Sequence, residues 1–218
     1  MKMIFNKTTY IIISIVFLFM LLGVGFFSKG SLNIESNVPT VKAEIDGKAI
    51  TLNSAQSFPI QAGFHTISTT SQFYDRQNIS LIIFPWFQKT VSLTLNPNQE
   101  GRALLDKGTL LTKHTANFTR TKNSNEYLDS MKEYLTSDAY DSLSFQIEDS
   151  LQSQNTTSPT DMPRVFLPIY GSYITDSNDG ATVTIDVTKT KDELSVNNIQ
   201  FVFGKAGSSW LVTNIIYN

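Results

Sequence analysis

Few side chains in this sequence could do chemistry. Its 218 residues include two histidines and no cysteine, which excludes disulfides and thiolate metal sites. His65 could serve as a metal ligand or a base, but no second His, Asp or Glu stands at a ligand spacing from it. We therefore expect its ring to pack or to hydrogen-bond at the edge of a sheet. His114 is expected on a solvent-facing surface.

Two carboxylates, Asp138 and Asp141, stand where a helix is predicted to begin. A catalytic carboxylate would lie among apolar side chains, with a raised pKa. At a helix start the helix dipole stabilises the charged form instead, so we interpret both as capping residues. Tyr127, Tyr134 and Tyr140 recur at helical spacing, and we predict core positions or the lining of a pocket for them. We predict no catalytic residue, no cofactor and no metal.

Trp86 and Phe87 follow Pro85 and could form an exposed aromatic tip. Such a tip suits a sugar or a membrane surface, because an aromatic ring combines a large apolar area with a defined shape. The alternative is a hydrophobic plug in a small core. Both interpretations stay open, and we name Trp86 and Phe87 as a possible interaction surface.

Composition restricts the class of partner. There are 17 basic and 19 acidic residues and the net charge is −2, so bulk electrostatics give no argument for nucleic acid. The charged fraction of 17% is below the usual quarter, and Ser, Thr and Asn take up much of the difference, as in many wall-facing or secreted proteins.

Residues 10–27 read YIIISIVFLFMLLGVGFF and carry no charge. As a helix they would span about 27 Å, close to the hydrocarbon thickness of a bilayer, so we predict a transmembrane helix and a lipid bilayer as partner. Lys2 and Lys7 precede it, which favours a cytoplasmic tail at residues 1–9 and an extracytoplasmic remainder. A cleaved signal peptide is the alternative, but the run is long and lacks a small-x-small site.

Two domains are expected after this run. Residues 28–40 are polar and without periodicity, and we predict a linker. Residues 41–97 contain five or six short alternating runs with an Asp46-Gly47 turn, which predict a small antiparallel β domain. Residues 101–218 change period. They predict three helices and then four strands. The first helix is expected to be interrupted or bent near Gly108, the second to be capped by Asn123 or Ser124, and the third by Thr136 or Ser137. The fold class expected is α+β.

The β domain resembles a known module. The segments VKAEIDGK at 41–48, PIQAGFHTI at 59–67 and KTVSLTL at 89–95 are similar to the PEGA-type surface β module, although its Pro-Glu-Gly-Ala tetrad is absent. They are equally similar to the small β repeats of teicoplanin-resistance-associated (TcaA-like) membrane proteins. Neither family is known for catalysis, so the resemblance implies a spacer or adhesive element.

The C-terminal segment FVFGKAGSSWLV at 201–212 resembles the closing hairpin of the nuclear transport factor 2-like superfamily, over residues 101–218. That resemblance implies a cone of three helices packed on a curved four-stranded antiparallel sheet. The fold hosts enzymes, binders and scaffolds alike. A small β module followed by such a domain is the layout of TcaA-like proteins, but their cytoplasmic zinc ribbon is absent.

These observations give three functional expectations. The first is a single-pass, membrane-anchored, extracytoplasmic protein of the bacterial cell envelope that is non-catalytic. It would present a protein-interaction or scaffold surface to an envelope protein or a cell-wall component. The second is a small-ligand binder, or an envelope-stress or antibiotic-response sensor, that uses the cone pocket. The third is a cone-type isomerase or hydrolase.

Overall fold

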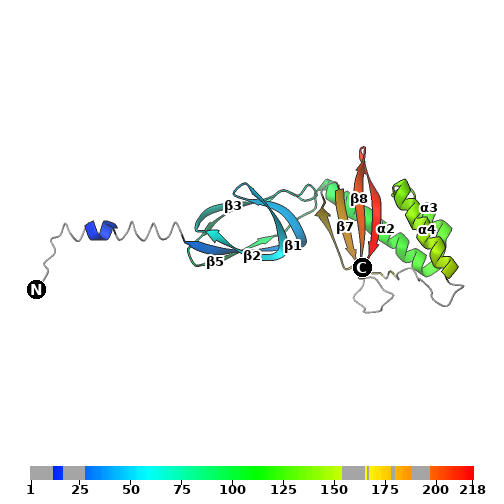
Figure 1. Cartoon of the computed structure of the whole chain (residues 1–218), viewed down its shortest axis with the longest axis horizontal. Coiled ribbons are helices and arrows are strands. Elements are labelled where there is room, and N and C mark those ends of the chain that lie inside the picture. Colours follow the sequence, from blue (N-terminus) through cyan, green and yellow to red (C-terminus); the bar gives the residue numbers. More distant parts are fainter. Residues whose placement is uncertain (1–11, 17–27, 154–164, 166, 178–179, 188–196) are drawn as a thin grey trace, which may run out of the picture. The chain divides into compact units, whose positions relative to one another are not determined.

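The chain folds as two compact units. The computed structural model describes residues 12–16, 28–153, 165, 167–177, 180–187 and 197–218. The first unit comprises residues 1–71 and 76–95, and the second comprises residues 72–75 and 96–218 (Figure 1). The chain therefore leaves the first unit for four residues, returns to it, and leaves it again after residue 95.

The predicted transmembrane helix is corrected by the structure. Over the part of the chain that it describes, no helix has the length and apolar character needed to cross a membrane. Of the predicted span 10–27, residues 12–16 are helical and the others lie outside the described residues. The predicted fold class and single-pass location are therefore wrong in this element, whereas the bilayer contact predicted for residues 10–27 stays a prediction. The predicted tail, residues 1–9, also lies outside the described residues.

The first unit is a five-stranded sheet. Its strands are β1 (Lys29–Ile45), β2 (Lys48–Gln61), β3 (Gly63–Thr69), β4 (Asn78–Ile83) and β5 (Gln88–Leu93). The strand order is β2-β1-β3-β4, all antiparallel, and β5 pairs in parallel with β1. Strand β1 has room for both neighbours because its residues 31–36 pair with β5 and its residues 43–45 pair with β3.

Residues 28–40 are not a linker, since all but the first of them belong to β1. Leu32 and Ile34 are buried and alternate with polar neighbours, as a strand with one buried face requires. The pairing of β1 with β2 then shifts register between Glu35 and Thr40. The shift interrupts the period of two between the two halves of the strand.

The second unit combines three helices and a four-stranded sheet. The helices are α2 (Gln99–Thr121), α3 (Ser124–Met131) and α4 (Ser137–Ser153). The strands are β6 (Gly171–Asp176), β7 (Gly180–Asp186), β8 (Asn198–Ala206) and β9 (Ser209–Tyr217), antiparallel in the order β6-β7-β8-β9. The Asn123 side chain caps α3 by accepting the Glu126 N–H, and Thr136 accepts the Ala139 N–H at the start of α4.

Helix α2 is continuous, so the predicted interruption near Gly108 is wrong. The glycine serves close packing. A Cβ at Gly108 would lie 2.7 Å from Val183 Cγ1 on β7, and the missing side chain lets the helix approach the sheet.

Residues 72–75 pack into the second unit. Phe73 is fully buried with its ring edge-on to Trp210, at a centroid separation of 5.7 Å. The Tyr74 hydroxyl donates to the Ile174 carbonyl over 3.2 Å and accepts the Ile174 N–H over 2.9 Å. This segment lies within residues 41–97, the predicted β domain, so the two units are more interwoven in sequence than the pattern indicated.

Candidate interaction surface

The connection between β4 and β5 is a tight turn that exposes three aromatic side chains. The Phe87 N–H donates to the Phe84 carbonyl over 3.3 Å, and Trp86 has φ of 63°. With Pro85 second and a positive φ third, these are the features of a type II turn, whose third position favours Gly or Asn. A bulky residue there is an outlier, and the left-handed conformation costs about 1–2 kcal/mol.

Backbone hydrogen bonds fasten this turn to the start of β1. The Trp86 N–H donates to the Lys29 carbonyl over 3.0 Å, and the Ser31 N–H donates to the Phe87 carbonyl over 2.9 Å. Between them, Gly30 leaves no space for a side chain. A Cβ at Gly30 would lie 2.4 Å from Ile83 Cγ2 and 2.6 Å from the Phe84 carbonyl oxygen.

The side chains of the turn are turned outward. Trp86 is 77% exposed, Phe87 70% and Phe84 62%. These values exclude the hydrophobic-plug interpretation of Trp86 and Phe87, because a plug would be buried. The interaction surface predicted at these two residues stays a prediction, and their side chains have the exposure that it requires.

Two further apolar side chains extend this surface along the neighbouring strands. Phe64 on β3 stands directly opposite Ile82 on β4, and they are 84% and 42% exposed. Phe84 follows Ile82 at the strand period of two and therefore points to the same face. We call Phe64, Ile82, Phe84, Trp86 and Phe87 the aromatic patch.

The aromatic patch is large for a surface feature. Aromatic side chains have about 150–250 Å² each, so four of them at 62–84% exposure present roughly 500 Å² of apolar surface. The largest apolar patch on a typical monomer is about 300–600 Å² and is often functional. Lys29 and Lys89 are exposed beside it, and residues 81–90 include no acidic side chain. The part of the rim formed by Lys29 and Lys89 is therefore basic, whereas the Asp46 carboxylate near Phe64 is paired with His65.

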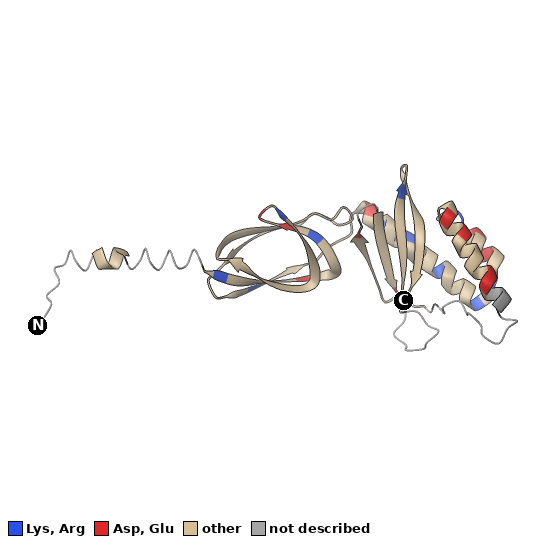
Figure 2. Cartoon of the chain, viewed as in Figure 1, with Lys and Arg blue, Asp and Glu red and all other residues tan. Residues whose placement is uncertain are grey.

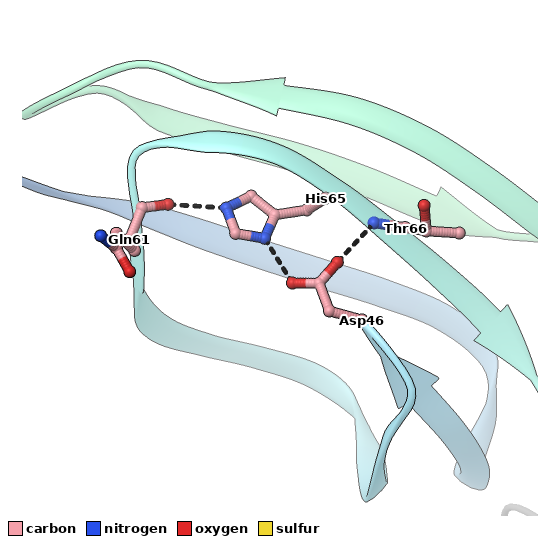
Figure 3. A network of polar contacts seen from close by, with 4 residues as sticks. All are labelled: Asp46, Gln61, His65 and Thr66. Carbon is pink, nitrogen blue, oxygen red and sulfur yellow. Dashed lines mark hydrogen bonds and ion pairs between the residues drawn. The ribbon is translucent and has the colours of Figure 1, made fainter. Parts of the chain in front are cut away.

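His65 lies beside the aromatic patch in a saturated polar network (Figure 3). Its Nδ1 donates to Asp46 Oδ2 over 2.6 Å and its Nε2 donates to the Gln61 carbonyl over 2.7 Å. A carboxylate and a carbonyl only accept, so both ring nitrogens carry a proton when both bonds form. No lone pair is then left for a metal or for general base catalysis.

Asp46 supplies the other half of this network. It occupies the two-residue turn between β1 and β2, where Asp46 and Gly47 both have positive φ, as a type I′ hairpin turn requires. Its Oδ1 accepts the Thr66 N–H over 2.9 Å. Partial burial raises the pKa of Asp46, but the hydrogen bonds from His65 and Thr66 and the charge of His65 outweigh it and lower the pKa below 3.8.

The predicted pocket tyrosines lie in different environments. Tyr127 is buried, stacks on Phe118 at 4.7 Å and shares a hydrogen bond of 2.9 Å with the Thr115 hydroxyl, and burial raises its pKa. Tyr134 is half-buried, with Lys107 Nζ 5.7 Å from its ring centroid. Tyr140 is half-buried on α4.

The remaining candidates show no catalytic grouping. His114 is half-buried and lines a cavity of about 100 Å³ with Phe118 and Tyr127. Asp138 and Asp141 are exposed in the first turns of α4. Among the residues that the structure describes, no three His, Cys, Asp or Glu side chains are grouped so that they could hold a metal ion.

A second cavity, of about 540 Å³, lies beside α2. Its lining includes two cations, Lys113 and Arg120, and the apolar side chains of Ala116, Val165 and Leu167. The sequence pattern gave no signal for it, because Val165 and Leu167 are distant in sequence from α2.

Sequence reasoning found Trp86 and Phe87 but missed the rest of the aromatic patch. The available signal was the run Ile82-Ile83-Phe84. A strand with one buried face alternates, so three consecutive apolar residues place at least one on the outer face.

Comparisons with known proteins leave the family open. No family model matches the chain, and no curated protein matches it. A de novo designed β-sheet protein solved by NMR is similar over 54% of this chain and 90% of its own, with 13% identity and a TM-score of 0.34. A DUF3823 family protein from Parabacteroides merdae is similar over 88% of this chain and 80% of its own, with 8% identity and a TM-score of 0.28. Similarities at this level carry no functional argument.

Proposed function

We propose that this chain is a non-catalytic binding protein whose first unit docks a partner protein through the aromatic patch. The observation that carries the proposal is Trp86, which is 77% exposed in a left-handed conformation. Backbone strain of this kind persists where the surrounding structure enforces it, and it is concentrated at functional sites. An exposed tryptophan among phenylalanines also has the composition of a binding hot spot.

The chemistry of the first unit supports binding over catalysis. His65 has both ring nitrogens engaged, and the aromatic patch holds no nucleophile or carboxylate. The predicted resemblance of residues 41–97 to surface β modules, which implies a spacer or adhesive element, points the same way.

Site-specific photo-crosslinking tests this proposal. The photoreactive analogue benzoylphenylalanine replaces Trp86 in one variant and Tyr170, an exposed aromatic of the second unit, in the control. We expect a defined crosslinked protein from position 86 and none from position 170. The product should disappear when Phe64→Ser and Phe87→Ser are added. Equal crosslinking from both positions, or none from position 86, contradicts the proposal.

The cavity beside α2 favours a second candidate, a small-ligand binder. Two cations together with apolar side chains in one lining suit an amphipathic anion such as a fatty acid. We expect fatty acids to raise the melting temperature of the wild type, and the effect to be lost in Lys113→Ala/Arg120→Ala but kept in the control Lys132→Ala. An unchanged shift in the double variant argues against this site.

A further inference from the structure

We infer that the aromatic patch of one molecule docks on the exposed face of helix α4 in a second copy of the chain, so that the protein self-associates head to tail. The inference rests on the proposed function, because it names the partner of the same surface. It follows from charge complementarity, from the exposed apolar residue on α4, and from the area that a stable contact needs.

Helix α4 offers an apolar side chain inside an acidic rim. Phe145 is 71% exposed, whereas Leu143 and Ile147 on the opposite side of the helix are buried. Asp141, Glu148 and Asp149 stand four residues before, three after and four after Phe145, and all are exposed. Residues at these spacings are neighbours on a helix surface.

The acidic character extends over α3 and α4 together (Figure 2). From residue 124 to residue 149 the only basic side chain is Lys132, set among Glu126, Asp129, Glu133, Asp138, Asp141, Glu148 and Asp149. The aromatic patch has the opposite rim, Lys29 and Lys89. Arranging opposite potentials around an apolar centre steers association and suppresses wrong partners.

Charge also decides between two modes of self-association. A symmetric contact would place the aromatic patch against its own copy, so the lysines of both molecules would share one rim and repel. A head-to-tail contact places the same lysines against carboxylates. The observed charges therefore favour the heterologous arrangement, which extends into rings or filaments.

The aromatic patch has the apolar area that one side of a specific contact needs. A standard interface buries about 800 Å² on each partner, of which about 57% is apolar, so one side needs roughly 450 Å² of apolar surface. The aromatic patch supplies roughly 500 Å². On the α4 side Phe145 supplies roughly 110–180 Å² of apolar surface, so the contact there depends mainly on the carboxylates around it.

A charge-swap experiment on the full chain tests the inference. The first variant carries Lys29→Glu and Lys89→Glu, and the second carries Asp141→Lys and Glu148→Lys. In each variant the rim of the aromatic patch and the exposed face of α4 then carry charges of the same sign, so neither variant should self-associate. An equimolar mixture restores opposite charges at every contact and should assemble. Lys42→Glu/Arg76→Glu, exposed residues outside the aromatic patch, is the control.

Sedimentation velocity between about 1 and 200 µM protein, a range matched to micromolar affinity, measures the outcome. For the wild type we expect a mass that rises with concentration and an association at least tenfold weaker in about 500 mM salt than in about 50 mM, because salt screens the rim charges. The control should behave as the wild type. Trp86→Ser should remain folded by circular dichroism and monomeric.

Two results overturn the inference. One is a wild type that stays monomeric throughout. The other is an Asp141→Lys/Glu148→Lys variant that associates as the wild type does. In either case, a crosslink from position 86 to a different protein would leave the proposed function standing. The absence of any crosslink from position 86 would contradict both the proposed function and the self-association.

Discussion

Because Trp86 adopts a left-handed conformation, we can predict which of two variants at this position is the more stable. Trp86→Gly and Trp86→Ala remove the same indole ring, so lost side-chain contacts are nearly equal in the two variants. They differ in the backbone, because alanine keeps the Cβ that disfavours φ of 63°. The comparison therefore isolates the strain at this turn.

The magnitude follows from two opposing effects. A Cβ in the left-handed region costs about 1–2 kcal/mol, whereas the greater freedom of glycine in the unfolded chain costs about 0.4–1 kcal/mol. We expect Trp86→Gly to be more stable than Trp86→Ala by roughly 0.5–1 kcal/mol. For a domain of this size, that difference corresponds to a melting temperature higher by about 2–8 °C.

Ile82 provides the matched control in the adjacent strand. It is exposed but has ordinary strand geometry, so Ile82→Ala should be more stable than Ile82→Gly by about 0.5–1 kcal/mol. Calorimetry on the four variants measures both differences. If Trp86→Ala melts at or above Trp86→Gly, the strain at this turn is absent and the functional argument built on it fails.

Three further predictions concern the packing and polar network of the two units. Because the pKa of Asp46 is lowered in the folded state, its stabilising contribution is complete above pH 3.8 and is lost as the pH falls through the lower pKa of the folded state. Between pH 6 and pH 2, the melting temperature should therefore fall less steeply with decreasing pH for Asp46→Asn than for the wild type. Gly108→Ala should cost about 1–3 kcal/mol because its Cβ would meet Val183, and adding Val183→Ala should recover part of the loss in urea unfolding. Phe73→Ala should destabilise the second unit by about 3–5 kcal/mol, measured by the unfolding transition of Trp210 fluorescence in a Trp86→Phe background.

Local patterns in the sequence predicted local features well. The Asp46-Gly47 pair indicated a tight hairpin turn, and both residues adopt the positive φ that such a turn needs. Asn123 and Thr136 were among the predicted caps and both accept the expected N–H. These features are set mainly by a few consecutive residues, so a local pattern is enough to predict them.

Features that depend on distant partners were missed. The first half of β1 has Leu32 and Ile34 in alternation, but its pairing with β5 joins residues far apart in sequence. The burial of Phe73 against Trp210 is likewise a long-range contact with no local pattern. The apolar run at 10–27 favoured a membrane span by length and hydropathy, whereas no helix among the described residues is long and apolar enough to cross a membrane.

The misread start of β1 and the aromatic patch are physically connected. The turn that presents Trp86 rests on Gly30, where a side chain would collide with Ile83 and with the Phe84 carbonyl. The Lys29 carbonyl and the Ser31 N–H hold that turn from either side of the glycine. A true linker at residues 28–40 could not enforce a left-handed tryptophan, because enforcing it requires fixed partners. The strand that sequence periodicity failed to reveal is thus the element that holds the exposed surface in place.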